Sequence, residues 1–161
     1  NAYKFLEAFS NNNYLKKNLK IIFFGGGNFN SYEKNIIHNL GLENKVELII
    51  GSDSELISLY KKARLMVYPS KYEGLGLPIL EAMTYGCPVA TSYTSGMIEA
   101  GGDAVEYFDP DDIESISSSI VKLLDSEDYS KKLINLGYDH VKKFSWPLCA
   151  KQTFEIYKKL L

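Results

Sequence analysis

Two glutamates separated by seven residues, Glu73 and Glu81, enclose a glycine-rich stretch and are the residues best suited to bind a ligand. Gly74 and Gly76 remove side chains just before a segment that Pro78 marks as the start of a helix. The first turn of a helix carries unpaired N–H groups and the positive end of the dipole, which together favour an anion such as phosphate. A carboxylate beside such a turn needs another partner, and the vicinal hydroxyl groups of a sugar suit it.

A ligand that fits this pattern carries hydroxyl groups at both ends and phosphates between them, as a nucleotide sugar does. Spacing alone also permits a purely structural interpretation, in which Glu73 caps the turn and Glu81 is a surface residue of the helix. Both interpretations remain open at this point, because two glutamates eight positions apart say little without their context.

The elements that must position these residues alternate between short apolar runs and helical patterns. The apolar runs cover residues 19–24, 46–50, 65–68, 89–92 and 105–108. Strands that alternate with helices of this length predict βαβ units, and hence an α/β fold with one Rossmann-like parallel sheet of about five or six strands. We expect helices on both faces of the sheet and a helical C-terminal tail. Ligands bind such sheets beyond the carboxyl ends of the strands, which is where Glu73 lies.

Capping residues predict where several helices begin. We expect Ser31 to cap the helix that follows the first strand, and Ser52 or Asp53 to cap the next. Asp109, followed by a proline, is the expected cap of the helix that opens the last third of the chain. The acidic run 109–112 lacks the spacing of a calcium loop, so we interpret it as helix capping rather than a metal site.

The composition is that of one globular domain covering residues 1–161, with 45% apolar and 24% charged residues. The 18 basic and 20 acidic residues give a net charge of −2, which excludes a general nucleic-acid binder. Cys87 and Cys149 lie far apart without other ligands at metal spacing, so we expect neither a disulfide framework nor a zinc site. These cysteines and the lack of any Asn-x-Ser/Thr acceptor favour a reducing, cytoplasmic compartment. No apolar run approaches the ~20 residues that cross a bilayer.

The context of the two glutamates closely resembles the signature of the family-four retaining glycosyltransferases, the glycosyl transferases group 1. The stretch 73–81 reads Glu-Gly-Leu-Gly-Leu-Pro-Ile-Leu-Glu, preceded by Tyr-Pro-Ser and followed by Gly-Cys-Pro-Val-Ala-Thr-Ser over 86–92. Segments that match other parts of the family are 23–27, 42–51, 96–99, 102–104, 109–110 and 144–150. The resemblance covers essentially the whole sequence and favours the ligand-binding interpretation of Glu73.

The resemblance implies half of a GT-B fold, in which two Rossmann-like domains face each other across a cleft and the C-terminal one binds the nucleotide-sugar donor. This sequence is similar to that C-terminal domain. By analogy, Glu81 would bind the ribose diol, and Glu73, the residue assigned to catalysis, would contact hydroxyl groups of the transferred sugar. The other implied donor-binding residues are Gly74, Leu75, Gly76 and Leu77 at the sugar and diphosphate, Ile50 and Gly51 at the base, and Gly25, Gly26 and Gly27 along the cleft wall.

The activity that the resemblance implies is transfer of a hexose from a nucleotide-diphosphate sugar to a glycan or lipid-linked acceptor, in polysaccharide or glycolipid biosynthesis. Retention by same-face attack, with the donor phosphate taking the acceptor proton, needs no protein nucleophile, and neither a cofactor nor a metal is expected. The implied partners are the acceptor and an N-terminal acceptor domain of the same polypeptide. Peripheral association with the inner face of a membrane would occur through that domain.

The N-terminus departs from the family pattern. The family carries an Arg and a Lys on the diphosphate, the Lys directly before a helix that residues 1–9 match. That Lys would precede Asn1, and Lys4 is out of register, so we interpret Lys4 as an exposed helix residue. Because the sequence begins with Asn1 rather than Met, we expect it to be a piece of a longer protein. Losing charge-assisted contacts weakens binding, so we expect these residues alone to bind donor weakly and to transfer no sugar.

Three other functions deserve comparison. A dinucleotide-binding oxidoreductase would explain Gly25–Gly27 after a strand, but its fingerprint needs glycine where Asn30 stands, and it leaves Glu73 and Glu81 unexplained. A receiver-type signalling domain needs acidic residues where Gly25 and Pro69 stand. A nucleotide-sugar epimerase or glycoside phosphorylase on the same scaffold remains the alternative, although the residues around the two glutamates favour a transferase.

Overall fold

The computed structural model describes residues 1–160, in which helices and strands alternate until the last third, which is mainly helical. In chain order the elements are α1 (Ala2–Asn11), α2 (Asn13–Asn18), β1 (Ile21–Phe24), α3 (Ser31–Asn39), β2 (Val46–Ile49), α4 (Asp53–Lys62), β3 (Met66–Tyr68), α5 (Leu77–Thr84), β4 (Val89–Ser92), α6 (Gly96–Gly101), β5 (Glu106–Phe108), α7 (Ile113–Asp125), α8 (Glu127–His140), a 3₁₀ turn at Val141–Lys143, and α9 (Trp146–Leu160). The predicted strands are confirmed to within two residues at each end.

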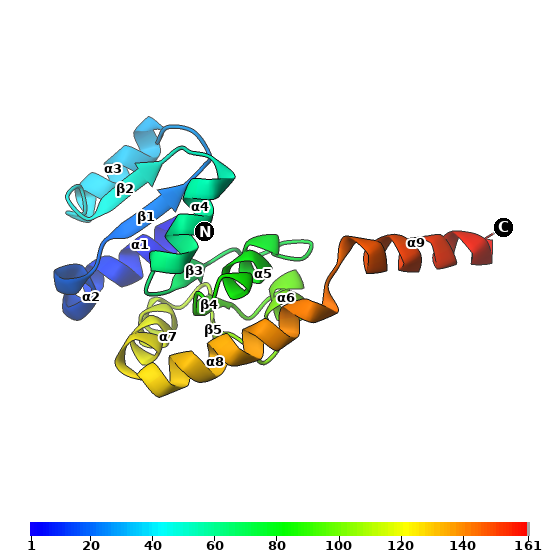
Figure 1. Cartoon of the computed structure of the whole chain (residues 1–161). Coiled ribbons are helices and arrows are strands. Elements are labelled where there is room, and N and C mark those ends of the chain that lie inside the picture. The colour runs from blue at the N-terminus through cyan, green and yellow to red at the C-terminus, as the bar shows by residue number, and fades with distance from the viewer. Residues whose placement is uncertain (161) are drawn as a thin grey trace.

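The strands are parallel and helices lie on both sides of them, which confirms the predicted α/β class (Figure 1). β1 pairs with β2, from Ile21 opposite Val46 to Phe24 opposite Ile49. β4 pairs with β3 on one side and with β5 on the other, and all four of its residues are buried, as in the centre of a parallel sheet. One difference from the expected single sheet is that these ladders form two groups, and within residues 1–160 no ladder joins β1 to β3.

Helix α1 joins the two groups of strands through side chains. Its apolar residues recur at helical spacing, and Phe5, Leu6, Ala8 and Phe9 are buried in one core cluster. The same cluster contains Ile21 of β1, Ala90 of β4, and Ile116 and Ile120 of α7. Packing of apolar side chains therefore holds β1 and β2 to the rest of the chain.

A second core cluster fixes α5, the helix that carries Glu81. Ile79, Ala82 and Met83 of α5 pack with Val89 of β4 and Met97 of α6. Glu81 lies between buried neighbours in sequence but is exposed, so the buried face of α5 determines that Glu81 faces outward.

Two of the expected helix caps are wrong by one to three residues. Asn30, rather than Ser31, caps α3, and its side-chain oxygen accepts a hydrogen bond from the N–H three residues later at 3.0 Å. Asp112, rather than Asp109, caps α7, while Asp109 accepts a hydrogen bond within the preceding turn. Ser52 caps α4, as one of the two residues expected there. A run of Asp, Asn and Ser residues offers several equivalent capping groups, so tertiary packing selects among them.

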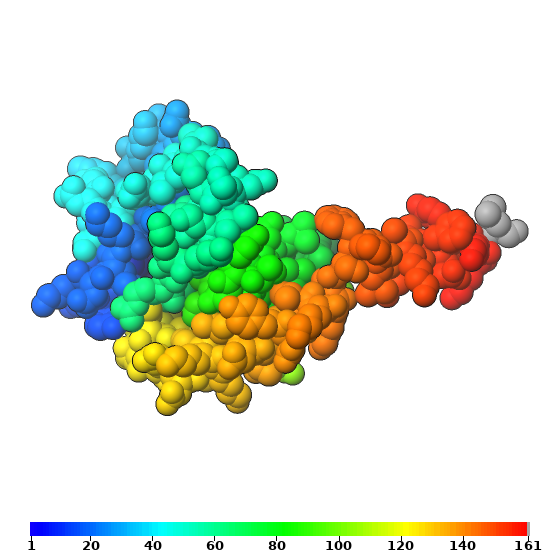
Figure 2. All heavy atoms as spheres, viewed as in Figure 1, coloured from blue at the N-terminus to red at the C-terminus, as the bar shows by residue number. Residues whose placement is uncertain are grey.

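The last helix, α9, extends away from the rest of the molecule (Figure 1). Figure 2 shows its spheres standing clear of the body that the other elements form. None of its described residues is buried, and Trp146 at its start is 78% exposed. Within residues 1–160, the helices are all too short or too polar to pass through a lipid bilayer.

Replacing Phe9 with alanine tests whether α1 holds the two groups of strands together. Phe9 is 2% exposed, so Phe9→Ala should lower the free energy of unfolding by about 3–5 kcal/mol, measured by urea denaturation. Tyr3→Ala is the matched control on the same helix; Tyr3 is 45% exposed, and the change should stay within about 0.5 kcal/mol. Equal effects of the two substitutions would contradict this role of α1.

Candidate functional site

The loop between β3 and α5 carries Glu73, and Glu81 follows in the second turn of α5. Gly76 is the N-terminal cap of α5 and has a φ of +80°, a left-handed conformation that side chains other than glycine rarely adopt. A Cβ atom there would also lie 3.2 Å from the side chain of Ile79. The conformation of this turn therefore explains Gly76. Pro78 has no N–H group and the N–H of Ile79 donates to the Gly76 carbonyl at 2.9 Å, so at the start of α5 the N–H of Leu77 is the donor without a backbone partner among residues 1–160.

Glu73 is half-buried and is held by two hydroxyl groups. Tyr68 donates a hydrogen bond to Oε1 of Glu73 at 2.9 Å, and Ser70 donates to the same oxygen at 2.8 Å. Burial and the Glu73 carboxylate raise the pKa of Tyr68, so its hydroxyl stays protonated and remains a donor at neutral pH. Because both donors take Oε1, the other carboxylate oxygen of Glu73 can accept hydrogen bonds from a ligand.

Glu81 is exposed and has one hydroxyl partner. Tyr60 of α4 donates a hydrogen bond to Oε2 of Glu81 at 3.1 Å. Burial, together with the neighbouring Glu81 carboxylate, raises the pKa of Tyr60, so this hydroxyl also remains a donor. Each glutamate thus has one oxygen engaged by the protein and one that can bind a ligand.

The loop after β4 packs directly against the Glu73 loop. The Ser95 hydroxyl donates to the backbone carbonyl of Glu73 at 2.8 Å, and the N–H of Gly96 donates to the same carbonyl at 3.3 Å. Ser95 has a φ of +48°, and among residues 1–160 it is the only residue other than glycine with a positive φ. A Cβ atom on Gly96 would lie 2.4 Å from the carbonyl oxygen of Gly74 and 2.7 Å from the Cα of Leu75, so only glycine fits there.

The structure brings some of the predicted site residues together and leaves others in separate loops. Gly74, Leu75, Gly76 and Leu77 form the continuous turn between the two glutamates, and Leu77 is 47% exposed. The remaining predicted residues follow other strands: Gly25, Gly26 and Gly27, all with positive φ, come after β1, and Ile50 and Gly51 come after β2. In the described residues no hydrogen bond connects these two loops to the Glu73 loop, so their role at the same ligand stays a prediction.

Sequence patterns missed several residues that shape this site. Tyr60 donates to Glu81, and Ser70 and Ser95 donate to Glu73. Tyr60 and Ser95 belong to other elements and Ser70 acts across a turn, so local sequence patterns do not reveal these contacts. The one available signal was the clustering of hydroxyl residues at the ends of β3 and β4, next to the glycines.

The expectation that Lys4 is exposed is wrong. Lys4 is half-buried and its ammonium group lies 3.5 Å from the carboxylate of Glu7.

A basic residue of the Glu73 loop is already paired. The ammonium group of Lys71 contacts the carboxylate of Asp111, which precedes α7. No group of three or more His, Cys, Asp or Glu side chains able to hold a metal ion occurs in the part of the chain described here.

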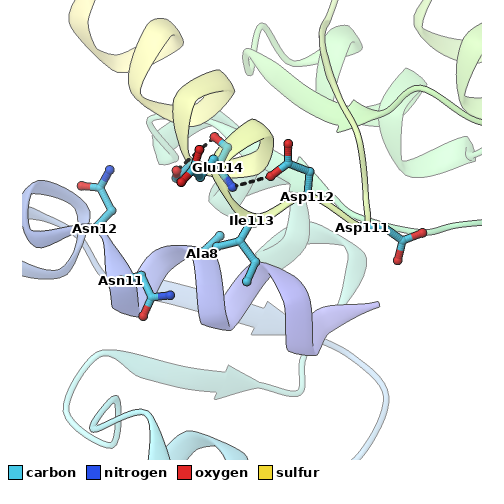
Figure 3. A pocket seen from close by; sticks show the side chains of 8 residues that line it. Ala8, Asn11, Asn12, Asp111, Asp112, Ile113 and Glu114 are labelled. Carbon is cyan, nitrogen blue, oxygen red and sulfur yellow. Dashed lines mark hydrogen bonds between the residues drawn. The ribbon is translucent and has the colours of Figure 1, made fainter.

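A hollow of about 640 Å³ lies between the end of α1 and the start of α7, and its lining includes Asp111, the partner of Lys71 (Figure 3). Its lining includes Asn11 and Asn12 from the α1 side and Asp112 and Glu114 from the α7 side. Asp112 accepts a hydrogen bond from the N–H of Glu114 at 2.9 Å and so serves as a helix cap. Asp111, Asp112 and Glu114 place three carboxylates around the hollow, which disfavours a phosphate, so the Glu73 loop remains the better candidate.

Comparisons with known proteins point to one family. Residues 1–140 match the family described as "Glycosyl transferases group 1". The O-antigen chain mannosyltransferase B of Escherichia coli is 44% identical over 67% of this chain and 28% of its own length. The MMP alpha-(1->4)-mannosyltransferase of Mycolicibacterium hassiacum is 32% identical over 82% of this chain and 33% of its own.

Solved structures agree with the fold. The crystal structure of a glycosyltransferase from Rickettsia africae has a TM-score of 0.82 at 23% identity, over 97% of this chain and 43% of that chain. The chain thus spans less than half the length of these relatives.

Adding a methyl group at Gly96 tests the contact between the two loops. Gly96→Ala places a Cβ against backbone atoms that cannot move aside easily, and the free energy of unfolding should fall by about 1–3 kcal/mol. The amide resonances of Gly74 to Leu77 should shift as well, as measured by NMR. Gly74→Ala is the control, because a Cβ at Gly74 meets nothing within 4 Å; it should change stability by less than about 0.5 kcal/mol. If Gly96→Ala changed neither the free energy of unfolding nor the amide resonances, the contact between the two loops would not be tight.

Proposed function

The chain belongs to the glycosyl transferases group 1 family, and from this we propose that it is the donor-binding domain of a retaining glycosyltransferase. Such an enzyme transfers a hexose from a nucleotide-diphosphate sugar to a glycan or lipid-linked acceptor. The observation that supports this best is the pair Glu73 and Glu81, each with one carboxylate oxygen engaged by a hydroxyl group, on either side of a glycine turn at a helix start.

The charges of the site favour a different part of the donor for each group. Carboxylates repel phosphate, so Glu73 and Glu81 suit hydroxyl groups, and the diphosphate belongs at the bare N–H groups of 74–77. We assign the ribose diol to Glu81 and the hydroxyl groups of the transferred sugar to Glu73. Ile50 is 61% exposed after β2 and offers an apolar surface to a nucleobase.

The proposed reaction forms one bond and breaks another on the same face of the sugar. The bond between C1 and the diphosphate oxygen breaks as the acceptor oxygen bonds to C1, and the acceptor proton passes to the leaving diphosphate. The products are a nucleoside diphosphate and a glycoside with retained configuration. Glu73 is suited to orienting the sugar, because two hydroxyl groups hold its Oε1 and its other oxygen can accept a hydrogen bond from a sugar hydroxyl.

The relatives favour mannose as the hexose. Both of the relatives described above are named as mannosyltransferases, one of them for the O-antigen chain. We therefore propose a mannosyl nucleotide as the donor and a growing polysaccharide as the acceptor, which a second domain of the same polypeptide would bind. The proposal places the reaction in the cytoplasm, at the inner face of a membrane if the acceptor is lipid-linked.

Removing the Glu81 carboxylate should weaken nucleotide binding. A hydrogen bond to a charged group contributes about 1.5–3 kcal/mol, so Glu81→Ala should reduce affinity for the preferred nucleotide by roughly 10- to 150-fold. The measurement is an NMR titration at the 74–77 amides with GDP, UDP and ADP at up to millimolar concentration. Glu47→Ala, which removes an exposed carboxylate from β2, is the control and should leave affinity unchanged. Unaltered affinity in Glu81→Ala would refute the assignment to the diol.

Neutralising Glu73 should affect the sugar more than the nucleotide. In the full-length protein, Glu73→Gln should lower turnover with GDP-mannose at least about tenfold, because an orienting contact to the sugar is lost, while affinity for GDP stays within about twofold. Initial rates and calorimetry measure the two quantities. Parallel losses in turnover and in GDP affinity would mean that Glu73 anchors the loop rather than the sugar.

A further inference from the structure

Tyr60 lies outside the segment that carries the two glutamates, yet its hydroxyl reaches one of them. It belongs to α4, which precedes β3 in the chain, and its side chain is 8% exposed. Its ring stacks on that of Tyr85 at the end of α5, with centroids 6.2 Å apart and planes 12° from parallel. From this fixed ring the hydroxyl donates to Oε2 of Glu81 at 3.1 Å.

A glutamate on a helix surface normally samples several rotamers. Fixing such a side chain on ligand binding costs entropy, which lowers affinity. The bond from Tyr60 fixes Glu81 before a ligand arrives and occupies Oε2, so that Oε1 is left to accept from a ligand. Because the ring of Tyr60 is buried and stacked, it cannot follow the carboxylate to another position.

We propose that Tyr60 is a positioning residue that holds the Glu81 carboxylate toward the ribose diol of the bound nucleotide. This inference rests on the proposed function of Glu81. A simpler role for the hydrogen bond is to satisfy a buried phenol, and this role would affect folding but not the ribose.

A double-mutant cycle in the 161-residue chain separates these roles. Tyr60→Phe keeps the ring and removes the hydroxyl, and we expect about tenfold weaker binding of GDP or UDP, whichever the chain prefers, at the 74–77 amides. In a Glu81→Ala background the same substitution should cause no further loss. Tyr85→Phe is the matched control, because the Tyr85 hydroxyl makes no hydrogen bond among residues 1–160; it should leave affinity unchanged.

The affinity for the 2′-deoxy form of the same nucleotide distinguishes the two roles, because a purely structural role of Tyr60 would affect both nucleotides equally. The 2′-deoxy form lacks half of the diol, so Tyr60→Phe should weaken its binding much less than that of the ribonucleotide.

Three results would overturn the inference. They are an unchanged affinity in Tyr60→Phe, an equal loss with and without Glu81, and an equal loss for the ribose and deoxyribose nucleotides. If Glu81→Ala itself leaves affinity unchanged, the proposed function of Glu81 fails, and the inference about Tyr60 fails with it. If Glu81→Ala weakens binding but Tyr60→Phe does not, only the inference about Tyr60 fails.

Discussion

The close approach of the loops that follow β3 and β4 is the constraint on which the site depends. The carbonyl of Glu73 accepts from both the Ser95 hydroxyl and the Gly96 N–H, and Gly96 has no room for a side chain against Gly74. Since β4 is buried along its whole length, its end fixes the second loop, and the second loop fixes the first. The backbone position of Glu73 therefore follows from the packing of a strand to which no ligand-binding residue is assigned, while Tyr68 and Ser70 hold its side chain.

Helix α5 likewise contributes residues both to the core and to the candidate site. Leu80 and Ala82 are buried while Glu81 between them is exposed, so any rotation of the helix that moved Glu81 would expose apolar surface. Tyr60 and Tyr85 extend this arrangement, because a stacked aromatic pair joins α4 to the end of α5 beside the carboxylate. The stability of this helix and the position of the Glu81 carboxylate are thus not independent.

Local patterns in the sequence predicted the elements well and the contacts between them poorly. Apolar runs located β1 to β5, and the glycines flanking α5 were expected where the structure places them, because these features depend on neighbouring residues. The caps of α3 and α7 were misplaced, since several residues there can cap equally well. Tyr60 could not be linked to Glu81, because they lie 21 positions apart and only tertiary packing in the second core cluster brings them together.

The absence of a backbone ladder between β1 and β3, within the residues described, bears on how the molecule opens. Ladder hydrogen bonds make strands separate together, whereas packed side chains let a segment detach at lower free energy. The unit formed by β1, α3 and β2 is joined to the remainder through the core around α1, so we expect it to open as a subglobal unit. Its amides would then exchange with solvent before those of β4, and Gly25–Gly27 would fluctuate on a different timescale from the Glu73 loop.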